Sequence, residues 1–170
     1  ACAAVAVALL VGASARAVPV GLQAFAGLPH RLEEVGERAG VLYVNDSLGT
    51  TPEAAAAGLR AWTDRRVILI AGGSSKGADF TLLGEAITAH AAALVTIGQE
   101  GPRIAQAART AGFTGPVDED CATMAAAVRA AVARATSGDV VLMSPACASF
   151  GMFASYAERG EAFRRAVAIT

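Results

Sequence analysis

Four short apolar runs recur along the chain, and they constrain its fold more than any other feature. Each run is rich in β-branched residues and is nearly apolar on both faces. Runs of this kind are typical of strands in a parallel sheet, because helices cover both faces of such a sheet. The runs lie at residues 41–44, 67–70, 93–97 and 140–143.

Helical patterns separate the runs, so that predicted strands and helices alternate. These patterns lie at about residues 52–63, 81–91, 101–111, 119–136 and 155–168. Right-handed crossovers place such units in one sheet. The sequence therefore predicts an α/β fold with a doubly wound, mostly parallel Rossmann-like sheet and helices on both faces. The carboxyl ends of the strands then share one edge, where folds of this class bind ligands.

Composition excludes several classes of protein. The 170 residues are 54% hydrophobic, which is enough for one domain with a core. The formal net charge is -1, and no long block of one sign predicts a nucleic-acid or membrane partner. Cys2, Cys121 and Cys147 are far apart and predict neither a disulfide framework nor a zinc site. We therefore expect a cytoplasmic monomer.

Polar, turn-rich loops follow the four predicted strands. Thr50 or Thr51 can cap the helix after the first strand, and Pro52 fits its first turn. Lys76 lies among glycines after the second strand, beside a helix start. Backbone N–H groups, hydroxyls and a lysine on one edge suit a ligand that carries carboxylate or phosphate. The loops read NDSLGTTPE, AGGSSKGADF, GQEGPR and SPACASFGMF.

These features also have purely structural interpretations. The first loop can be no more than a capped helix start, and the second an ordinary βα turn with a solvated Lys76. The second loop does not have the spacing of a P-loop. Cys147 has no base nearby in the sequence and is interpreted as a buried structural thiol. The last helical pattern, YAERGEAFRRAV, is interpreted as an amphipathic helix with its Glu and Arg residues on the exposed face.

Six motifs in order resemble a known family. The motifs are GLPHRLE, GVLYVNDS, TTPEA, AGGSSKGADF, VVLMSPACASFGMF and YAERGEAF. Together they closely resemble the carboxyl-terminal domain of the UDP-N-acetylmuramoylalanine–glutamate ligases of peptidoglycan synthesis, the MurD type. Residues 27–170 are identified with that glutamate-binding domain. Residues 1–26 look like the last helix and linker of the family's central ATP-hydrolysing domain, so the chain resembles a piece of a longer one.

The resemblance implies an ATP-dependent, amide-forming ligase. In that family ATP phosphorylates the carboxylate of UDP-N-acetylmuramoyl-L-alanine, and the amino group of glutamate attacks the acyl phosphate and releases ADP and phosphate. The implied partners are glutamate, UDP-N-acetylmuramoyl-L-alanine and ATP with Mg. ATP and Mg bind mainly to the central domain, whose P-loop does not occur in this sequence. We therefore expect the 170 residues alone to be inactive.

The resemblance also implies roles for individual residues. Four positions match residues on the nucleotide side of the family's site, and four match residues that hold glutamate. No residue of the chain is assigned a catalytic role or a metal ion. The nucleotide-side positions are His30, Arg31, Asn45 and Asp46. The glutamate positions are Thr50, Lys76, Ser149 and Phe150. Cationic and hydroxyl groups suit a dicarboxylate, and an arginine beside polyphosphate stabilises charge during phosphoryl transfer.

The sequence departs from the family pattern in the first loop. Many members have a lysine where this chain has Leu48, and Gly49 and Thr51 also differ from the usual residues. Relatives that add L-glutamate instead of D-glutamate carry similar variants, so both stereoisomers remain open. A stand-alone Rossmann-like module that binds a nucleotide or anion is an alternative function. A purely structural domain is a further alternative.

Overall fold

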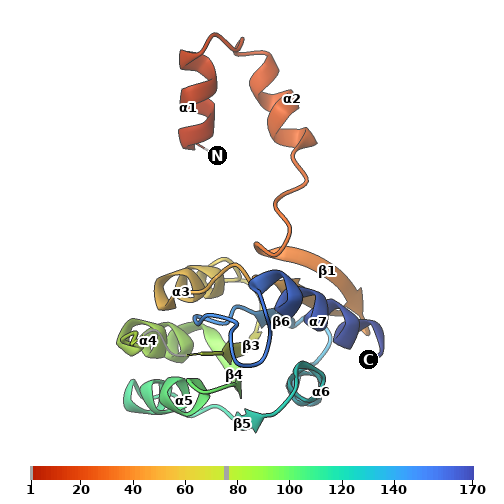
Figure 1. Cartoon of the computed structure of the whole chain (residues 1–170). Helices are drawn as coiled ribbons and strands as arrows, with labels where there is room; N and C mark the ends of the chain where they lie inside the picture. The colour runs from red at the N-terminus through yellow and green to blue at the C-terminus, as the bar shows by residue number, and fades with distance from the viewer. Residues whose placement is uncertain (1, 75–76) are drawn as a thin grey trace.

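Strands and helices alternate along most of the chain, as Figure 1 shows for the computed structural model. The structure describes residues 2–74 and 77–170. Its strands are β1 (Glu33–Arg38), β2 (Val41–Asn45), β3 (Val67–Gly72), β4 (Ala91–Ile97), β5 (Val117–Cys121) and β6 (Val140–Met143). Its helices are α1 (Cys2–Leu10), α2 (Ala17–Ala24), α3 (Pro52–Arg60), α4 (Thr81–His90), α5 (Gly101–Thr110), α6 (Met124–Arg134) and α7 (Tyr156–Ala168).

The six strands form one mixed sheet in the order β1-β2-β6-β3-β4-β5. β1 pairs with β2 in antiparallel orientation, and every other neighbouring pair is parallel. The last strand, β6, inserts between β2 and β3, and the residue pairs Asn45–Met143 and Ile70–Met143 mark its register. The predicted doubly wound, mostly parallel fold is confirmed. Its carboxyl edge carries the ends of β2, β6 and β3 side by side.

The two faces of the sheet carry alternate residues of the same strands. Helices α3, α4 and α5 cover one face (Figure 1), where Val44 and Leu69 pack in an apolar core. On the other face Tyr43 and Ile70 pack in a second core with α6 and α7. Burying a side chain as large as Leu or Ile contributes about 1.5–3 kcal/mol. Coverage of both faces explains why these strands are apolar at successive positions.

The two strands that the sequence analysis did not predict are the two edge strands, β1 and β5. They read EEVGER and VDEDC, and charged residues on an edge strand hinder pairing with other chains. The predicted helix at 119–136 is therefore wrong at its start, because residues 119–121 belong to β5. Helix α6 begins at Met124, and Oγ1 of Thr123 caps it by accepting a hydrogen bond of 3.1 Å from N of Ala126.

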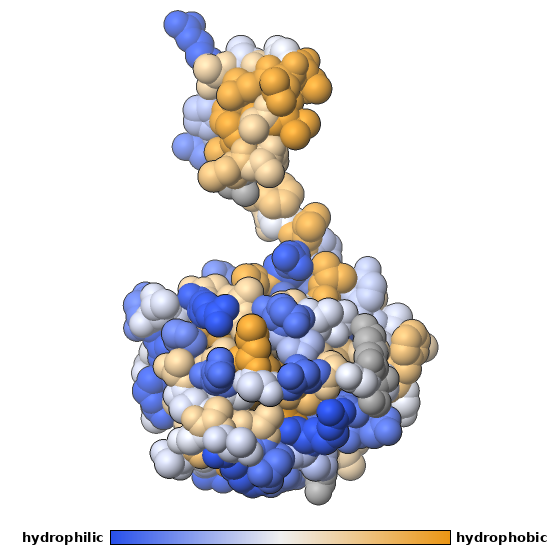
Figure 2. Space-filling model, turned by 90° about the vertical axis from the view of Figure 1, so that its left-hand side faces the viewer, coloured by the Kyte–Doolittle hydropathy of each residue, from blue (hydrophilic) through white to orange (hydrophobic). Residues whose placement is uncertain are grey.

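The first two helices stand apart from the sheet, and the chain between α2 and β1 links them to it (Figure 1). Neither α1 nor α2 contains a buried residue. Leu10 of α1 is 86% exposed, and Phe25, the residue after α2, is 64% exposed. Figure 2 shows the apolar surface of this segment. In the described ranges, no helix has the length and apolar character needed to cross a membrane. A unit boundary after residue 26 stays a prediction.

Candidate functional site

Three loops meet at the carboxyl edge of the sheet. N of Ala146 donates a hydrogen bond of 2.9 Å to the carbonyl oxygen of Gly49, and N of Ser74 donates one of 2.9 Å to that of Ala148. The loop after β6 therefore joins the loops after β2 and β3, as the sequence predicted. We name these segments the β2 loop (residues 46–51), the β3 loop (residues 73–80) and the β6 loop (residues 144–155).

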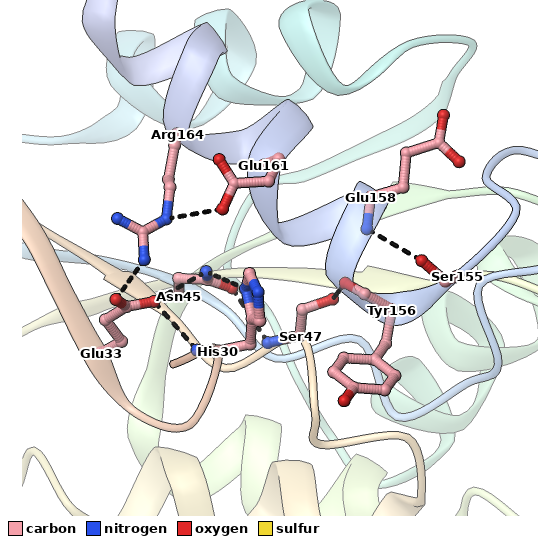
Figure 3. A network of polar contacts seen from close by, with 9 residues as sticks. All are labelled: His30, Glu33, Asn45, Ser47, Ser155, Tyr156, Glu158, Glu161 and Arg164. Carbon is pink, nitrogen blue, oxygen red and sulfur yellow. Dashed lines mark hydrogen bonds and ion pairs between the residues drawn. The ribbon is translucent and has the colours of Figure 1, made fainter. Parts of the chain in front are cut away.

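Asn45 and His30 form the centre of a polar network beside the β2 loop (Figure 3). Nδ2 of Asn45 lies 2.9 Å from Nδ1 of His30 and donates to Oε2 of Glu33 at 3.2 Å. The same Oε2 accepts a bond of 2.9 Å from N of His30, and Oε1 pairs with Arg164 of α7. Burial raises the pKa of Glu33, but hydrogen bonds from His30 and Arg164 outweigh it, so that the pKa lies below its ordinary value.

His30 is held in an unusual backbone conformation, with φ at 62°. Its ring packs on Gly160 of α7, where an added Cβ would lie 2.2 Å from Nδ1 of His30. The ring of Tyr156 meets it edge-on at 6.0 Å. Only 9% of His30 is exposed, whereas the neighbouring Arg31 is exposed. Of these two predicted nucleotide-side residues, His30 is therefore buried within the network and Arg31 is exposed, and their roles stay predictions.

Asp46 is directed into the protein. Its Oδ2 accepts a hydrogen bond of 2.6 Å from Oγ of Ser144, and its Oδ1 accepts one of 3.2 Å from N of Leu32. Gly49 and Gly58 pack against it so closely that an added Cβ would lie 2.5 Å and 3.3 Å from Oδ2. Burial raises the pKa of Asp46 above its ordinary value, although the hydrogen bonds from Ser144 and Leu32 oppose this.

Arg159 lies beneath the loops with no exposed surface. Its Nε donates to Oγ of Ser47 at 3.0 Å, its Nη2 to the carbonyl oxygen of Ser47 at 2.9 Å, and its Nη1 to that of Cys147 at 3.0 Å. Burial lowers its pKa to about 10. The expectation that the arginines of this helix lie on its exposed face is therefore wrong for Arg159. Cys147 is buried, as predicted.

The predicted glutamate positions lie on the three loops. Thr50 is partly buried on the β2 loop, and its neighbour Thr51 caps α3, with Oγ1 3.3 Å from N of Ala54. Ser149 is 4% exposed and Phe150 is 63% exposed, both on the β6 loop. Lys76 falls in the β3 loop but lies outside the described residues. The structure thus brings the loops of Thr50, Ser149 and Phe150 to one edge and leaves their roles as predictions.

Four residues at this edge were not among the predicted site residues. Glu33 lies on an edge strand whose charges resemble a solvated surface, and Ser47 and Ser144 are small polar residues that suit any turn. Arg159 lies in a helical pattern with several other charged residues, and this pattern did not distinguish it from them. The adjacent Gly160 was a usable signal, because a glycine inside a helix often marks a close approach to another segment.

The described residues contain no group of three or more His, Cys, Asp or Glu side chains that could hold a metal ion. Asp46, a carboxylate at the carboxyl edge, is already engaged by Ser144 and Leu32. The exposed Arg31 fits a phosphate group, because a guanidinium binds such oxygens in bidentate geometry.

Comparisons with known proteins agree with this arrangement. Residues 30–147 match the family described as "Mur ligase, glutamate ligase domain". A UDP-N-acetylmuramoylalanine–D-glutamate ligase of Anaeromyxobacter dehalogenans is 47% identical over 165 residues, which are 96% of this chain and 35% of that protein. The ligase of the same name from Pelotomaculum thermopropionicum is 43% identical over 97% of this chain and 36% of its own length. The chain thus spans about a third of the length of these relatives.

Solved structures show the same fold at low identity. The UDP-N-acetylmuramate-alanine ligase MurC of Thermotoga maritima superposes with a TM-score of 0.69 at 15% identity, over 97% of this chain and 35% of that one. A bifunctional folylpolyglutamate synthase/dihydrofolate synthase of Yersinia pestis gives a TM-score of 0.59 at 22% identity, over 92% and 34%. The family match covers well over half of the residues, and the chain therefore belongs to the Mur ligase family, as a glutamate ligase domain.

Proposed function

We propose that this chain forms the glutamate-binding part of an ATP-dependent ligase that joins D-glutamate to UDP-N-acetylmuramoyl-L-alanine in peptidoglycan synthesis. The observation that carries the proposal is the meeting of three polar loops at the carboxyl edge of the sheet. The names of the relatives at 43–47% identity support D-glutamate as the amino acid. The chain spans about a third of these proteins, so the remaining parts of the site would come from other segments.

On the nucleotide side, Arg31 would contact phosphate oxygens. Its guanidinium is exposed, and a cation there would stabilise charge that moves between oxygens in the transition state. His30 and Asn45 would orient this region, since the bond between their side chains is buried. Asp46 would fix the β2 loop through Ser144. ATP, with magnesium, would supply the phosphoryl group that activates the acceptor carboxylate.

On the amino-acid side, Lys76, Thr50 and Ser149 would bind the two carboxylates of glutamate. A dicarboxylate needs a cation and several donors, and charge-assisted hydrogen bonds are the strongest of these contacts. Phe150 would cover the ligand, because its exposed ring lies on the β6 loop beside Ser149. Correct placement of the glutamate amino group near the activated carboxylate would supply most of the rate enhancement from this side.

The test is an assay of the full-length protein that contains this chain. We expect release of phosphate from ATP that requires both UDP-N-acetylmuramoyl-L-alanine and D-glutamate, and little turnover with L-glutamate. Preference for L-glutamate would favour the alternative function, that of a relative that adds L-glutamate. Binding of nucleotide without amide formation would favour a stand-alone binding module. The 170-residue chain alone should show no turnover, because its sequence contains no P-loop.

A further inference from the structure

An ion pair at the start of α5 lies next to the β3 loop. The carboxylate of Glu100 is almost fully buried, with 4% of its side chain exposed, and Nη1 of Arg103 lies 2.6 Å from its Oε2. A buried carboxylate is costly unless it is paired and hydrogen-bonded, so Glu100 fixes the direction of the arginine. Arg103 itself is about half exposed, and its guanidinium lies at the protein surface.

Arg103 uses the rest of its guanidinium to hold the β3 loop. Nη2 donates a hydrogen bond of 3.1 Å to the carbonyl oxygen of Ala78. The Cζ atom lies 5.3 Å from the centre of the Phe80 ring, in the range of a cation–π contact. Phe80 is 4% exposed and therefore anchored in the core. One side chain of α5 thus contacts two residues at the far end of the loop.

The start of α5 also holds the near end of the loop. N of Glu100 donates a hydrogen bond of 3.0 Å to the carbonyl oxygen of Gly73. Gly98 packs on Gly73, where an added Cβ would lie 2.9 Å from its Cα. Both ends of the loop that contains residue 76 are therefore attached to residues 98–103. Arg103 is not part of the polar network at the carboxyl edge, and no role has been assigned to it above.

We propose that Arg103, oriented by Glu100, is a positioning residue for glutamate binding that acts through the β3 loop. The inference rests on the proposed function, because it assumes that Lys76 of this loop binds glutamate. Arg103 would not touch the substrate. It would hold Ala78 and Phe80 in place before glutamate arrives, and a binding segment that is already ordered loses less conformational entropy on binding. A lysine cannot replace it fully, since one ammonium lacks the planar fork that reaches Glu100 and Ala78 together.

The kinetic test uses the full-length ligase with Arg103→Met and Arg103→Lys. We expect Arg103→Met to raise the KM for D-glutamate by about tenfold, the factor that matches one lost contact of about 1.4 kcal/mol. The KM for ATP and the kcat should stay within about twofold, and Arg103→Lys should restore part of the loss. Arg109→Met is the matched control, because Arg109 lies on the same helix and pairs with Glu119 away from the loop.

A double variant separates positioning from a general structural role. If the loop serves Lys76, Arg103→Met should have little further effect on the KM for D-glutamate in a Lys76→Ala background. Additive effects of the two changes would overturn the proposal. An unchanged KM in Arg103→Met would also overturn it, as would an equal rise in Arg109→Met. A wild-type enzyme without D-glutamate-dependent turnover would instead refute the proposed function.

Hydrogen exchange provides a readout without activity. In the 170-residue chain, Arg103→Met should speed amide exchange in a peptide that covers residues 77–83, and Arg109→Met should not. Exchange that is unchanged in this peptide would show that Arg103 does not order the loop, and the proposal would fail whatever the kinetics. This outcome does not depend on the proposed function.

Discussion

Oδ2 of Asp46 accepts a 2.6 Å hydrogen bond from Oγ of Ser144, and this buried contact joins the β2 loop to the end of β6. The two residues are 98 positions apart in the sequence. Their contact links the segments that follow β2 and β6, which are the first and last parallel strands in chain order and neighbours in the sheet. Both side chains are buried. The buried carboxylate of Asp46 is therefore one of the groups that fix the position of the β2 loop, together with the contacts that Arg159 and Ala146 make with it.

The first prediction is that Ser144→Ala destabilises the protein. The change leaves Oδ2 of the buried Asp46 without its side-chain donor, which costs roughly 1–3 kcal/mol. Urea denaturation would measure the free energy of unfolding, with Ser155→Ala as a control for loss of a hydroxyl that caps the exposed start of α7. An effect of Ser144→Ala smaller than that of the control would contradict the importance of this contact.

The pH dependence of stability provides a second prediction. Burial raises the pKa of Asp46 above its ordinary value of 3.8, so the folded state binds its proton more tightly than the unfolded state. Stability contributed by this group is therefore greatest at acidic pH and falls as pH rises from 3.8 through the raised pKa. As pH rises over this window, the free energy of unfolding of the wild type should fall relative to that of Asp46→Asn. Chemical denaturation at several pH values would measure this difference. A difference between the two proteins that does not change with pH would contradict this prediction.

Glu33 should behave in the opposite way, which makes a third prediction. Its pKa is lowered in the folded state, so the contribution is fully present above the ordinary value of 4.5 and is lost as pH falls through the lowered pKa. Glu33→Gln should cost roughly 1 kcal/mol near neutral pH, the size of one partly buried, charge-assisted contact with Arg164. The cost should shrink in acid. If Glu33→Gln lowers the free energy of unfolding by the same amount at every pH, the ionised carboxylate of Glu33 is not responsible for the effect.

A fourth prediction concerns Arg159. Arg159→Met would remove the three buried hydrogen bonds that the guanidinium donates to Ser47 and Cys147, and we expect a loss of about 3 kcal/mol in the free energy of unfolding. Arg165→Met is the control on the same helix, because Arg165 is exposed and its replacement should cost less than about 0.5 kcal/mol. Arg159→Lys should recover only part of the stability, since an ammonium cannot reach all three acceptors. Equal effects of the two Met variants would refute this role.

Some of these relationships were predictable from the sequence, and others were not. Leu42 and Leu69 indicated strands covered on both faces, because both sequence neighbours of each are also apolar. Once the strands are parallel, their carboxyl ends must lie at the same edge of the sheet. β1 and β5 lacked that signal, since an edge strand pairs on one side and tolerates charges. Arg159 was missed because its partners are mainly backbone carbonyls, and no pattern of side chains encodes them.

The last prediction concerns Lys76, which the family resemblance assigns to glutamate binding and which lies outside the described residues. In the full-length enzyme, Lys76→Ala should remove a charge-assisted contact of roughly 1.5–3 kcal/mol, or about one to two powers of ten in glutamate affinity. In the family pattern that the sequence resembles, many members have a second lysine where this chain has Leu48, so we expect the upper part of that range.

Steady-state kinetics with varied D-glutamate at saturating ATP would measure this effect, and the KM for ATP should change much less. Lys76→Arg tests the chemistry of the contact, because it keeps the charge but changes the shape of the donor, and it should bind glutamate better than the Ala variant. A solvated turn residue would leave both the KM for D-glutamate and the kcat unchanged, since surface charges contribute little. That result would remove Lys76 from the site, and the cation for the glutamate carboxylates would then have to come from another segment of the enzyme.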